Sequence, residues 1–137
     1  MKKVILIAAL FIICNKIFAQ ADTSGQYMLI VRYDLTAPSP DAELVKANAP
    51  KWGTFIGELT RSGKLVMGLR PDNGGKTISG KTTTVEDKPY AGDNKIVSSF
   101  FLVKAGSMAE ATEIAKKCPI YELGGNVEVR KVMNMAN

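Results

Sequence analysis

The sequence predicts an α+β fold of the ferredoxin-like type, in which an antiparallel sheet carries two helices on one of its faces. The predicted elements follow the order β-α-β-β-(β)-α-β, in which the parentheses mark an additional strand, and this is a ferredoxin-like order. The second helix has clear start and stop signals. The strongest predicted strand, residues 95–103, is apolar on both of its faces.

The first strand and the first helix are predicted within residues 27–63. Residues 27–33 are rich in β-forming side chains. Pro50 is expected to start or restart the main helix, and Gly63 is expected to end it. The apolar face of this helix has the spacing i, i+3, i+4 and i+7, and it consists of Trp52, Phe55, Ile56 and Leu59.

The middle of the chain is predicted to form strands joined by turns. Residues 64–69 are read as a second strand, and the Pro-Asp-Asn-Gly-Gly run at 71–75 is a dense turn signal. The polar, β-branched stretch 77–85 is typical of a hairpin with one face in solvent. Residues 87–94 are expected to form a loop that leads into the strand at 95–103.

The second helix and the closing strand follow from local signals near the C-terminus. Ser107 and Glu110 have the spacing of a capping box. Pro119 stops the helix, and the Gly-Gly pair at 124–125 turns the chain into a strand at 126–132. The buried stripe of the helix is expected to contain Met108, Ala111, Ile114, Ala115 and Cys118.

The predicted central strands are apolar on two faces, although two helices can cover only one. Strict alternation within the strand predicted at 95–103 gives two apolar sets. Ile96, Phe100 and Leu102 lie on one side, and Val97, Phe101 and Val103 lie on the other. Strands of this kind are usually covered on both faces, and a large exposed apolar patch marks an interface. We therefore expect a homodimer in which the two sheets pack together.

The N-terminus has the layout of a secretory signal peptide. Lys2 and Lys3 precede an apolar run at 4–13, which is shorter than the roughly 20 residues of a membrane-spanning helix. Cleavage after Ala19 or Ala21 satisfies the small-residue rule, and Ala19 is preferred. A lipoprotein would use Cys14, but the bulky Ile13 before it disfavours this alternative.

These assignments divide the chain of 137 residues into four parts and predict a secreted or periplasmic protein without a stable membrane anchor. The parts are a signal peptide at 1–19, a flexible leader at 20–25, one domain at 26–133 and a tail at 134–137. Removing the signal peptide leaves 15 basic and 13 acidic residues, which lowers the net charge from +5 to +2. Because no dense basic stripe remains, nucleic acid is not an expected partner.

The cysteine and histidine content narrows the possible chemistry. The chain has no histidine, and the predicted mature protein keeps a single cysteine, Cys118. An intramolecular disulfide is therefore excluded, as are His-based catalytic triads and most zinc, haem and copper sites. No cofactor or metal is expected. Cys118 falls on the apolar stripe at a helix C-terminal end, which favours a core position over a reactive thiol.

The order and spacing of several segments resemble the YCII-related proteins of the DGPF type. Residues 109–132, with Ala-Lys-Lys-Cys-Pro and Gly-Gly-Asn-Val-Glu-Val-Arg, are similar to the end of that family. Similar segments also occur at 27–30, 51–53, 57–59, 62–65 and 75–81. The resemblance covers about residues 26–132 and implies a dimeric α/β barrel, in agreement with the two-sided strands.

The chain also departs from the family pattern. The Asp-Gly-Pro-Phe motif is replaced by Asp87-Lys-Pro-Tyr90, and the acidic segment that usually follows is replaced by residues 91–95. The resemblance implies that related proteins use a His-Asp pair. This chain has no histidine, so the chemistry of that pair cannot be carried over to it. Most family members are cytoplasmic, so the signal peptide is a further departure. The family carries no defined general function.

Residues 75–82 match the G-x-x-x-x-G-K-[ST] pattern of a phosphate-binding P-loop. Such a loop needs a strand before it and a helix after it, so that the helix N-terminus faces the phosphates. The residues that follow are Thr83, Thr84 and Val85, which favour a strand. We therefore interpret the segment as a hairpin and reject an ATPase function.

Four residues are candidates for a functional site. Asp87 and Tyr90 lie on the loop that resembles the family motif, where they are weak candidates for proton transfer. Arg32 and Arg130, on the first and last strands, are candidates for binding an anion. The alternative interpretations are a simple turn for the loop and solvated or salt-bridged positions for the two arginines.

The sequence favours an exported homodimeric barrel that binds a small polar or anionic molecule in a cleft. The alternative is a non-catalytic module for protein interaction or structure. Whether the protein is an enzyme stays open at this level.

Overall fold

The computed structural model describes residues 24–133. The predicted signal peptide, all but the end of the predicted leader and the C-terminal tail lie outside these residues. Among the described residues, no helix is long and apolar enough to cross a membrane.

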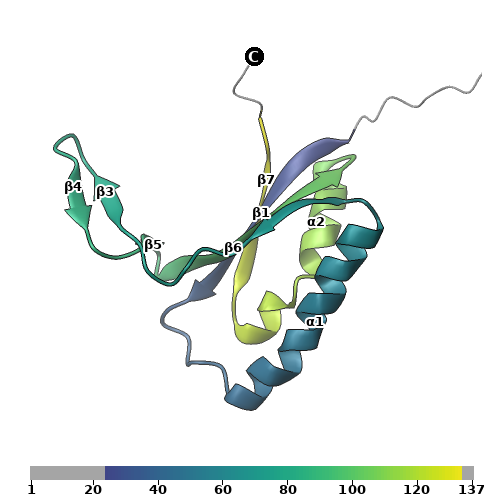
Figure 1. Cartoon of the computed structure of the whole chain (residues 1–137), viewed down its shortest axis with the longest axis horizontal. Coiled ribbons are helices and arrows are strands. Elements are labelled where there is room, and N and C mark those ends of the chain that lie inside the picture. Colours follow the sequence, from purple (N-terminus) through teal and green to yellow (C-terminus); the bar gives the residue numbers. More distant parts are fainter. Residues whose placement is uncertain (1–23, 134–137) are drawn as a thin grey trace, which may run out of the picture.

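The fold is built on one antiparallel sheet with two helices on one face (Figure 1). The strands β1 (Gly25–Asp34), β2 (Leu65–Leu69), β6 (Lys95–Ala105) and β7 (Asn126–Lys131) pair in the order β2-β6-β1-β7, and the short β5 (Ala91–Gly92) pairs with the start of β6. The helices are α1 (Ala42–Arg61) and α2 (Met108–Lys116). This arrangement confirms the predicted α+β, ferredoxin-like fold.

The first helix begins earlier than the sequence suggested. Asp41 is the N-cap of α1 and accepts a hydrogen bond from the Glu43 backbone N–H at 3.4 Å. Pro50 therefore lies inside the helix, and the expectation that it starts the helix was wrong. A proline here removes the hydrogen bond to the Lys46 carbonyl. Lys46 is exposed, so water can replace that bond.

The second helix begins as its capping box predicts. Ser107 Oγ accepts a hydrogen bond from the Glu110 N–H at 3.1 Å, and the Glu110 carboxylate accepts from the Gly106 N–H at 2.7 Å. Lys64 Nζ, which lies 2.7 Å from the same carboxylate, ties the helix start to the residue before β2. Met108 was expected in the buried stripe, but it is 44% exposed because it occupies the first, outward-facing turn.

Pro119 ends α2, as predicted, but the chain does not turn at once. It forms a short 3-10 helix, η1 (Pro119–Leu123), before Gly124 adopts a φ of 76° and reverses the chain into β7. Gly125 packs so closely that an added Cβ would lie 2.5 Å from the Arg32 carbonyl oxygen. The Gly-Gly pair therefore combines a left-handed turn with a position that has no room for a side chain.

A β-bulge in the middle of the sheet changes one face assignment. Val31 pairs with Ser99 and Arg32 pairs with Val97, so Ser98 is the extra residue in β6. A bulge reverses the alternation on one side of it. Val97 therefore shares the helix-free face with Phe100, and Ile96 shares the helix face with its partner Tyr33. The predicted grouping of Ile96 with Phe100 was wrong for this reason.

The core lies between the sheet and the helices. Its fully buried side chains include Leu29, Val31, Val103 and Ile120. Three aromatic rings pack at one end: the Phe55 and Phe101 centroids are 5.7 Å apart in an edge-to-face arrangement, and Trp52 lies 6.2 Å from each. Burial of rings of this size is among the largest single contributions to core stability.

Residues 71–90 form an arm that extends beyond the sheet, away from the helices (Figure 1). The arm contains a separate hairpin of β3 (Thr77–Ser79) and β4 (Thr84–Glu86). The predicted hairpin is thus confirmed. The P-loop pattern falls on this hairpin and is followed by a strand, which confirms that it lacks the helix a P-loop requires.

Candidate functional site

The two predicted arginines lie on the helix-free face of the sheet, where they share one acid. Arg32 Nη2 lies 2.7 Å from Glu128 Oε2, and Arg130 Nε lies 3.8 Å from Glu128 Oε1. Arg32 and Tyr90 both line a hollow of about 380 Å³ at this face. The structure thus brings three of the four candidates into one neighbourhood, but Glu128 already offsets part of the positive charge.

Asp87 lies elsewhere, on the arm. Its carboxylate pairs with Lys76 Nζ at 2.8 Å, and its side chain is 84% exposed. It does not line the hollow that contains Arg32. Tyr90 is 74% exposed. Proton transfer by Asp87 and Tyr90 remains a prediction that the geometry of this single chain neither supports nor tests.

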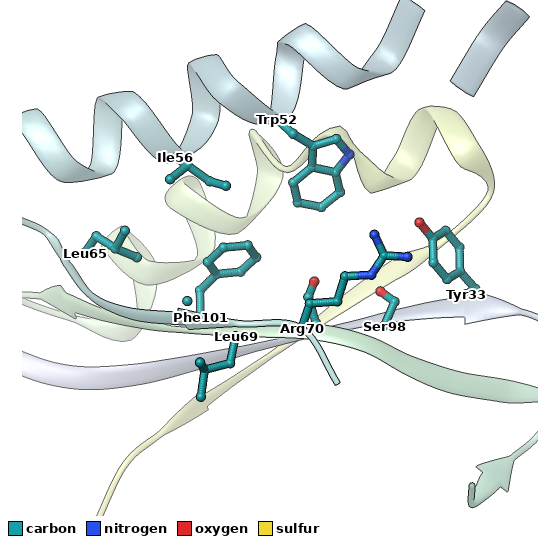
Figure 2. Close-up of a pocket in the computed structure, with 10 residues that line it drawn as sticks. Tyr33, Trp52, Ile56, Leu65, Leu69, Arg70, Ser98 and Phe101 are labelled. Carbon is teal, nitrogen blue, oxygen red and sulfur yellow. The ribbon is translucent and has the colours of Figure 1, made fainter. Parts of the chain in front are cut away.

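A second cleft lies between α1 and the sheet. It has a volume of about 330 Å³, which is at the lower end of the range for small-molecule sites. Figure 2 shows Trp52 and Ile56 entering it from α1, with Arg70, Ser98 and Tyr33 across from them at the sheet. The full lining is Tyr33, Trp52, Ile56, Leu65, Gly68, Leu69, Arg70, Ser98, Ser99 and Phe101.

The strands explain why these residues meet. Tyr33 continues the buried face of β1 beyond Val31, and Ser99 pairs with Val31 on that same face. Gly68 pairs with Phe101 and lets its ring pack closely against the strand, because a Cβ at position 68 would lie 2.9 Å from Phe101 Cδ1. Arg70 immediately follows β2. In Figure 2 its guanidinium extends over the sheet toward Tyr33, whereas Leu69 points to the opposite side.

The polar groups of this cleft are almost all hydrogen-bond donors without a partner. Ser98 Oγ donates to the Val31 carbonyl at 3.3 Å. Within residues 24–133, no hydrogen bond or ion pair occupies the side chains of Tyr33, Arg70 or Ser99. The indole N–H of Trp52 likewise has no acceptor within that range. Since the described lining residues include no carboxylate, Arg70 carries the only formal charge among them, and that charge is positive.

A further groove, of about 590 Å³, lies between α1 and η1 and is lined by Lys51, Glu122 and Cys118, among others. Lys51 Nζ pairs with Glu122 at 2.7 Å, and the lining also contains Glu58, Lys116 and Lys117. Cys118 is 3% exposed, and burial raises the pKa of its thiol from 9.0 to about 11. The prediction that Cys118 belongs to the core is confirmed.

Sequence reasoning missed the cleft between α1 and the sheet. Two signals were available. Ser98 and Ser99 interrupt an otherwise apolar strand, and Tyr33 places a hydroxyl at the end of a buried face. Nothing in the sequence indicated that Arg70 would join them. Within the described part of the chain, no group of three or more histidine, cysteine or acidic side chains is placed to hold a metal ion.

Two comparisons with known proteins gave matches. Residues 26–136 match the sequence pattern of the YCII-related domain. A structure of 5-chloro-2-hydroxyhydroquinone dehydrochlorinase (TftG) from Burkholderia phenoliruptrix AC1100, in complex with 2,5-dihydroxybenzoquinone, is similar with a TM-score of 0.42 and 15% identity, over 80% of this chain and 94% of that chain. No curated protein sequence matches the chain.

Proposed function

The chain belongs to the YCII-related domain family, and we propose that it is an exported homodimer that binds a small anionic molecule in the cleft between α1 and the sheet. The observation that carries the proposal is the group of donors around that cleft that have no partner within residues 24–133, with the Arg70 guanidinium as the only charge among the lining residues. Tyr33, Trp52 and Ser99 are half-buried, where donors are usually paired, and Arg70 is exposed. A ligand rich in acceptor atoms would pair them.

The cleft supports this function better than the hollow that contains the predicted arginines. Arg32 already forms an ion pair with Glu128, whose carboxylate would also repel an incoming anion. Arg70 has no such competitor among the described residues. The ligand proposed from the sequence is therefore retained, and its site moves from Arg32 and Arg130 to the opposite face of the sheet.

The homodimer is supported by the helix-free face of the sheet. Cross-strand pairing places a group of apolar side chains there, and several are substantially exposed in the single chain: Met67 at 46%, Leu69 at 49% and Val97 at 37%. Apolar area that faces water costs roughly 25 cal/mol per Å² relative to burial. A second copy packed on this face would remove that cost. Export is supported by the sequence pattern of residues 1–19.

A screen of small acids by thermal shift tests the proposed function. Wild-type protein is compared with Arg70→Gln, and Arg61→Gln is the matched control because it removes the same charge from the exposed last turn of α1. We expect acids that stabilise the wild type and the control but not Arg70→Gln. Hits that survive Arg70→Gln and disappear with Arg130→Gln would return the site to the helix-free face.

A protein-interaction module is the second candidate, and the arm is the observation that favours it. Ile78 and Val85 face each other across the hairpin and are 65% and 56% exposed. Isolated two-stranded hairpins are marginally stable in water, so a partner would stabilise this one. If the screen yields no ligand, and an Ile78→Ser variant loses a partner that the wild type retains in a pull-down, this second function is the correct one.

A further inference from the structure

The cleft between α1 and the sheet has two chemically different ends, and they define the ligand class more narrowly. Figure 2 shows the polar groups of Arg70, Tyr33 and Ser98 at one end and Phe101 and Leu65 toward the other. Trp52 and Ile56 form the wall on the helix side. We infer that the cleft takes a small monocarboxylate with a compact apolar body, with the carboxylate at the Arg70 end. This inference rests on the proposed function.

The polar end fits a carboxylate for reasons of charge and shape. A guanidinium presents paired N–H donors in a plane, which match the two oxygens of a carboxylate. The hydroxyl groups of Tyr33 and Ser99 can donate further hydrogen bonds to those oxygens. All of these groups lack a protein partner among residues 24–133.

The single positive charge favours a monoanion over a dianion. The lining has one arginine and no lysine. A phosphate monoester carries nearly two negative charges at neutral pH. One guanidinium would leave the second charge without a positive partner among the lining residues. The cleft should therefore bind a carboxylate more tightly than a phosphate ester that has the same body.

The apolar end limits the size and polarity of the body. The cleft volume is about 330 Å³, and one water molecule takes about 30 Å³ in the liquid, so a ligand of roughly ten non-hydrogen atoms would fill it. Trp52, Phe101 and Leu65 offer no hydrogen-bond acceptor to a polar body. A single ring or a short branched chain meets both conditions.

Trp52 provides a direct readout, because it is the only tryptophan of the chain and it lines the cleft. The probes are cyclohexanecarboxylate, its neutral analogue cyclohexanecarboxamide, acetate and cyclohexyl phosphate. Acetate has the carboxylate without the apolar ring, and cyclohexyl phosphate is a dianion. Each is titrated against the full mature chain while tryptophan fluorescence is recorded. The variants are Arg70→Gln, Tyr33→Phe and the control Arg61→Gln.

We expect cyclohexanecarboxylate to bind at least tenfold more tightly than each of the other three probes. Its advantage over the neutral carboxamide would come from charge-assisted pairing with Arg70. Arg70→Gln should remove this preference for the carboxylate over the carboxamide, Tyr33→Phe should weaken carboxylate binding a few-fold, and Arg61→Gln should change neither. Retention of the preference by Arg70→Gln would overturn the inference.

The remaining outcomes separate this inference from the proposed function. Equal binding of the carboxylate and the carboxamide would refute the ligand class while leaving a small-molecule cleft in place. Tighter binding of cyclohexyl phosphate would refute the monoanion but keep an anion site. If no probe changes the Trp52 signal at millimolar concentration in a folded protein, and the acid screen also gives no hit, the ligand class and the proposed function both fail.

Discussion

Gly68 lies directly opposite Phe101 in the β2–β6 pairing, and a Cβ at position 68 would approach Phe101 Cδ1 to 2.9 Å. The Phe101 ring in turn packs against Phe55 and Trp52. The absence of a side chain at position 68 therefore lets the Phe101 ring pack against the strand, and both residues line the cleft between α1 and the sheet.

The Gly68→Ala variant should be destabilised by about 1–2 kcal/mol, because the added methyl group forces the Phe101 ring to shift in a packed cluster. It should also weaken the binding of any ligand in the cleft, which Gly68 lines. Gly53→Ala is the control: no atom lies within 4 Å of the added Cβ, and alanine should stabilise the interior of α1 by about 0.5–1 kcal/mol. Urea unfolding measures both changes. A Gly68→Ala variant as stable as the wild type would contradict this packing argument.

The Gly124-Gly125 pair should respond unequally to alanine. At Gly125 the new Cβ would meet Ile120 and lie 2.5 Å from the Arg32 carbonyl oxygen, and backbone does not move away at low cost. We expect a loss of about 3 kcal/mol or more. At Gly124 the nearest atom is 4.0 Å away, and the cost of about 1 kcal/mol comes from its φ of 76°. Equal losses in denaturant titrations would refute this distinction.

Glu110 should make the stability depend on pH on the acid side. Lys64, followed by the Gly106 N–H, lowers the pKa of this carboxyl below its ordinary value of 4.5. Because the pKa is lower in the folded protein, the contribution is complete above pH 4.5 and is lost as the pH falls through the folded pKa. Glu110→Gln should therefore lose less stability than the wild type on acidification.

The control for this pH effect is Glu113→Gln, which removes the same charge from the same helix but leaves the capping box intact. Its unfolding free energy should follow that of the wild type on acidification. If both variants gave the same flattened profile, the effect would come from net charge and not from the contacts of Glu110.

Cys118 should be nearly inert in the folded protein. Burial raises the pKa of its thiol from 9.0 to about 11, which lowers the thiolate fraction at pH 8 on the order of a hundredfold. In protein that begins after residue 19, a thiol reagent should label Cys118 slowly in buffer and at once in urea. Equally fast labelling in both conditions would show that the thiol is accessible.

A charge on the helix-free face should dissociate the proposed homodimer. Leu102 pairs with Met28 and Met67 in the middle of that face. Leu102→Asp is expected to shift the mass measured by light scattering from dimer to monomer at micromolar concentration. Val45→Asp introduces the same charge at a 47% exposed position on α1 and should leave the dimer intact. A monomeric wild type would refute the dimer itself.

Local signals in the sequence were sufficient for several parts of the fold. Ser107 and Glu110 predicted the start of α2 because capping involves backbone groups within one helical turn. The same local reasoning failed at Pro50, where the sequence indicated a helix start. Asp41 caps the helix one residue before Ala42, and the helix tolerates the missing hydrogen bond on its exposed side.

The candidate site was less accessible to sequence reasoning. Arg32 was correctly assigned to a strand, but its partner Glu128 comes from a strand almost a hundred residues away, and that ion pair weakens its case as an anion site. Arg70 drew no attention because it stands alone after a strand. Whether a guanidinium is available to bind an anion depends on whether an acidic side chain lies beside it. Such an acidic side chain can come from a distant part of the sequence, as Glu128 does for Arg32.

The sequence by itself determined the order of the elements, the presence of apolar residues on both faces of the central strands, and the exclusion of histidine chemistry. These properties depend on side-chain type and on spacing over a few residues. Only the tertiary structure decided which donors meet. The strand order β2-β6-β1 and the bulge at Ser98 bring Tyr33, Arg70 and Ser99 to one cleft, because contacts between distant segments depend on register and packing that local spacing does not encode.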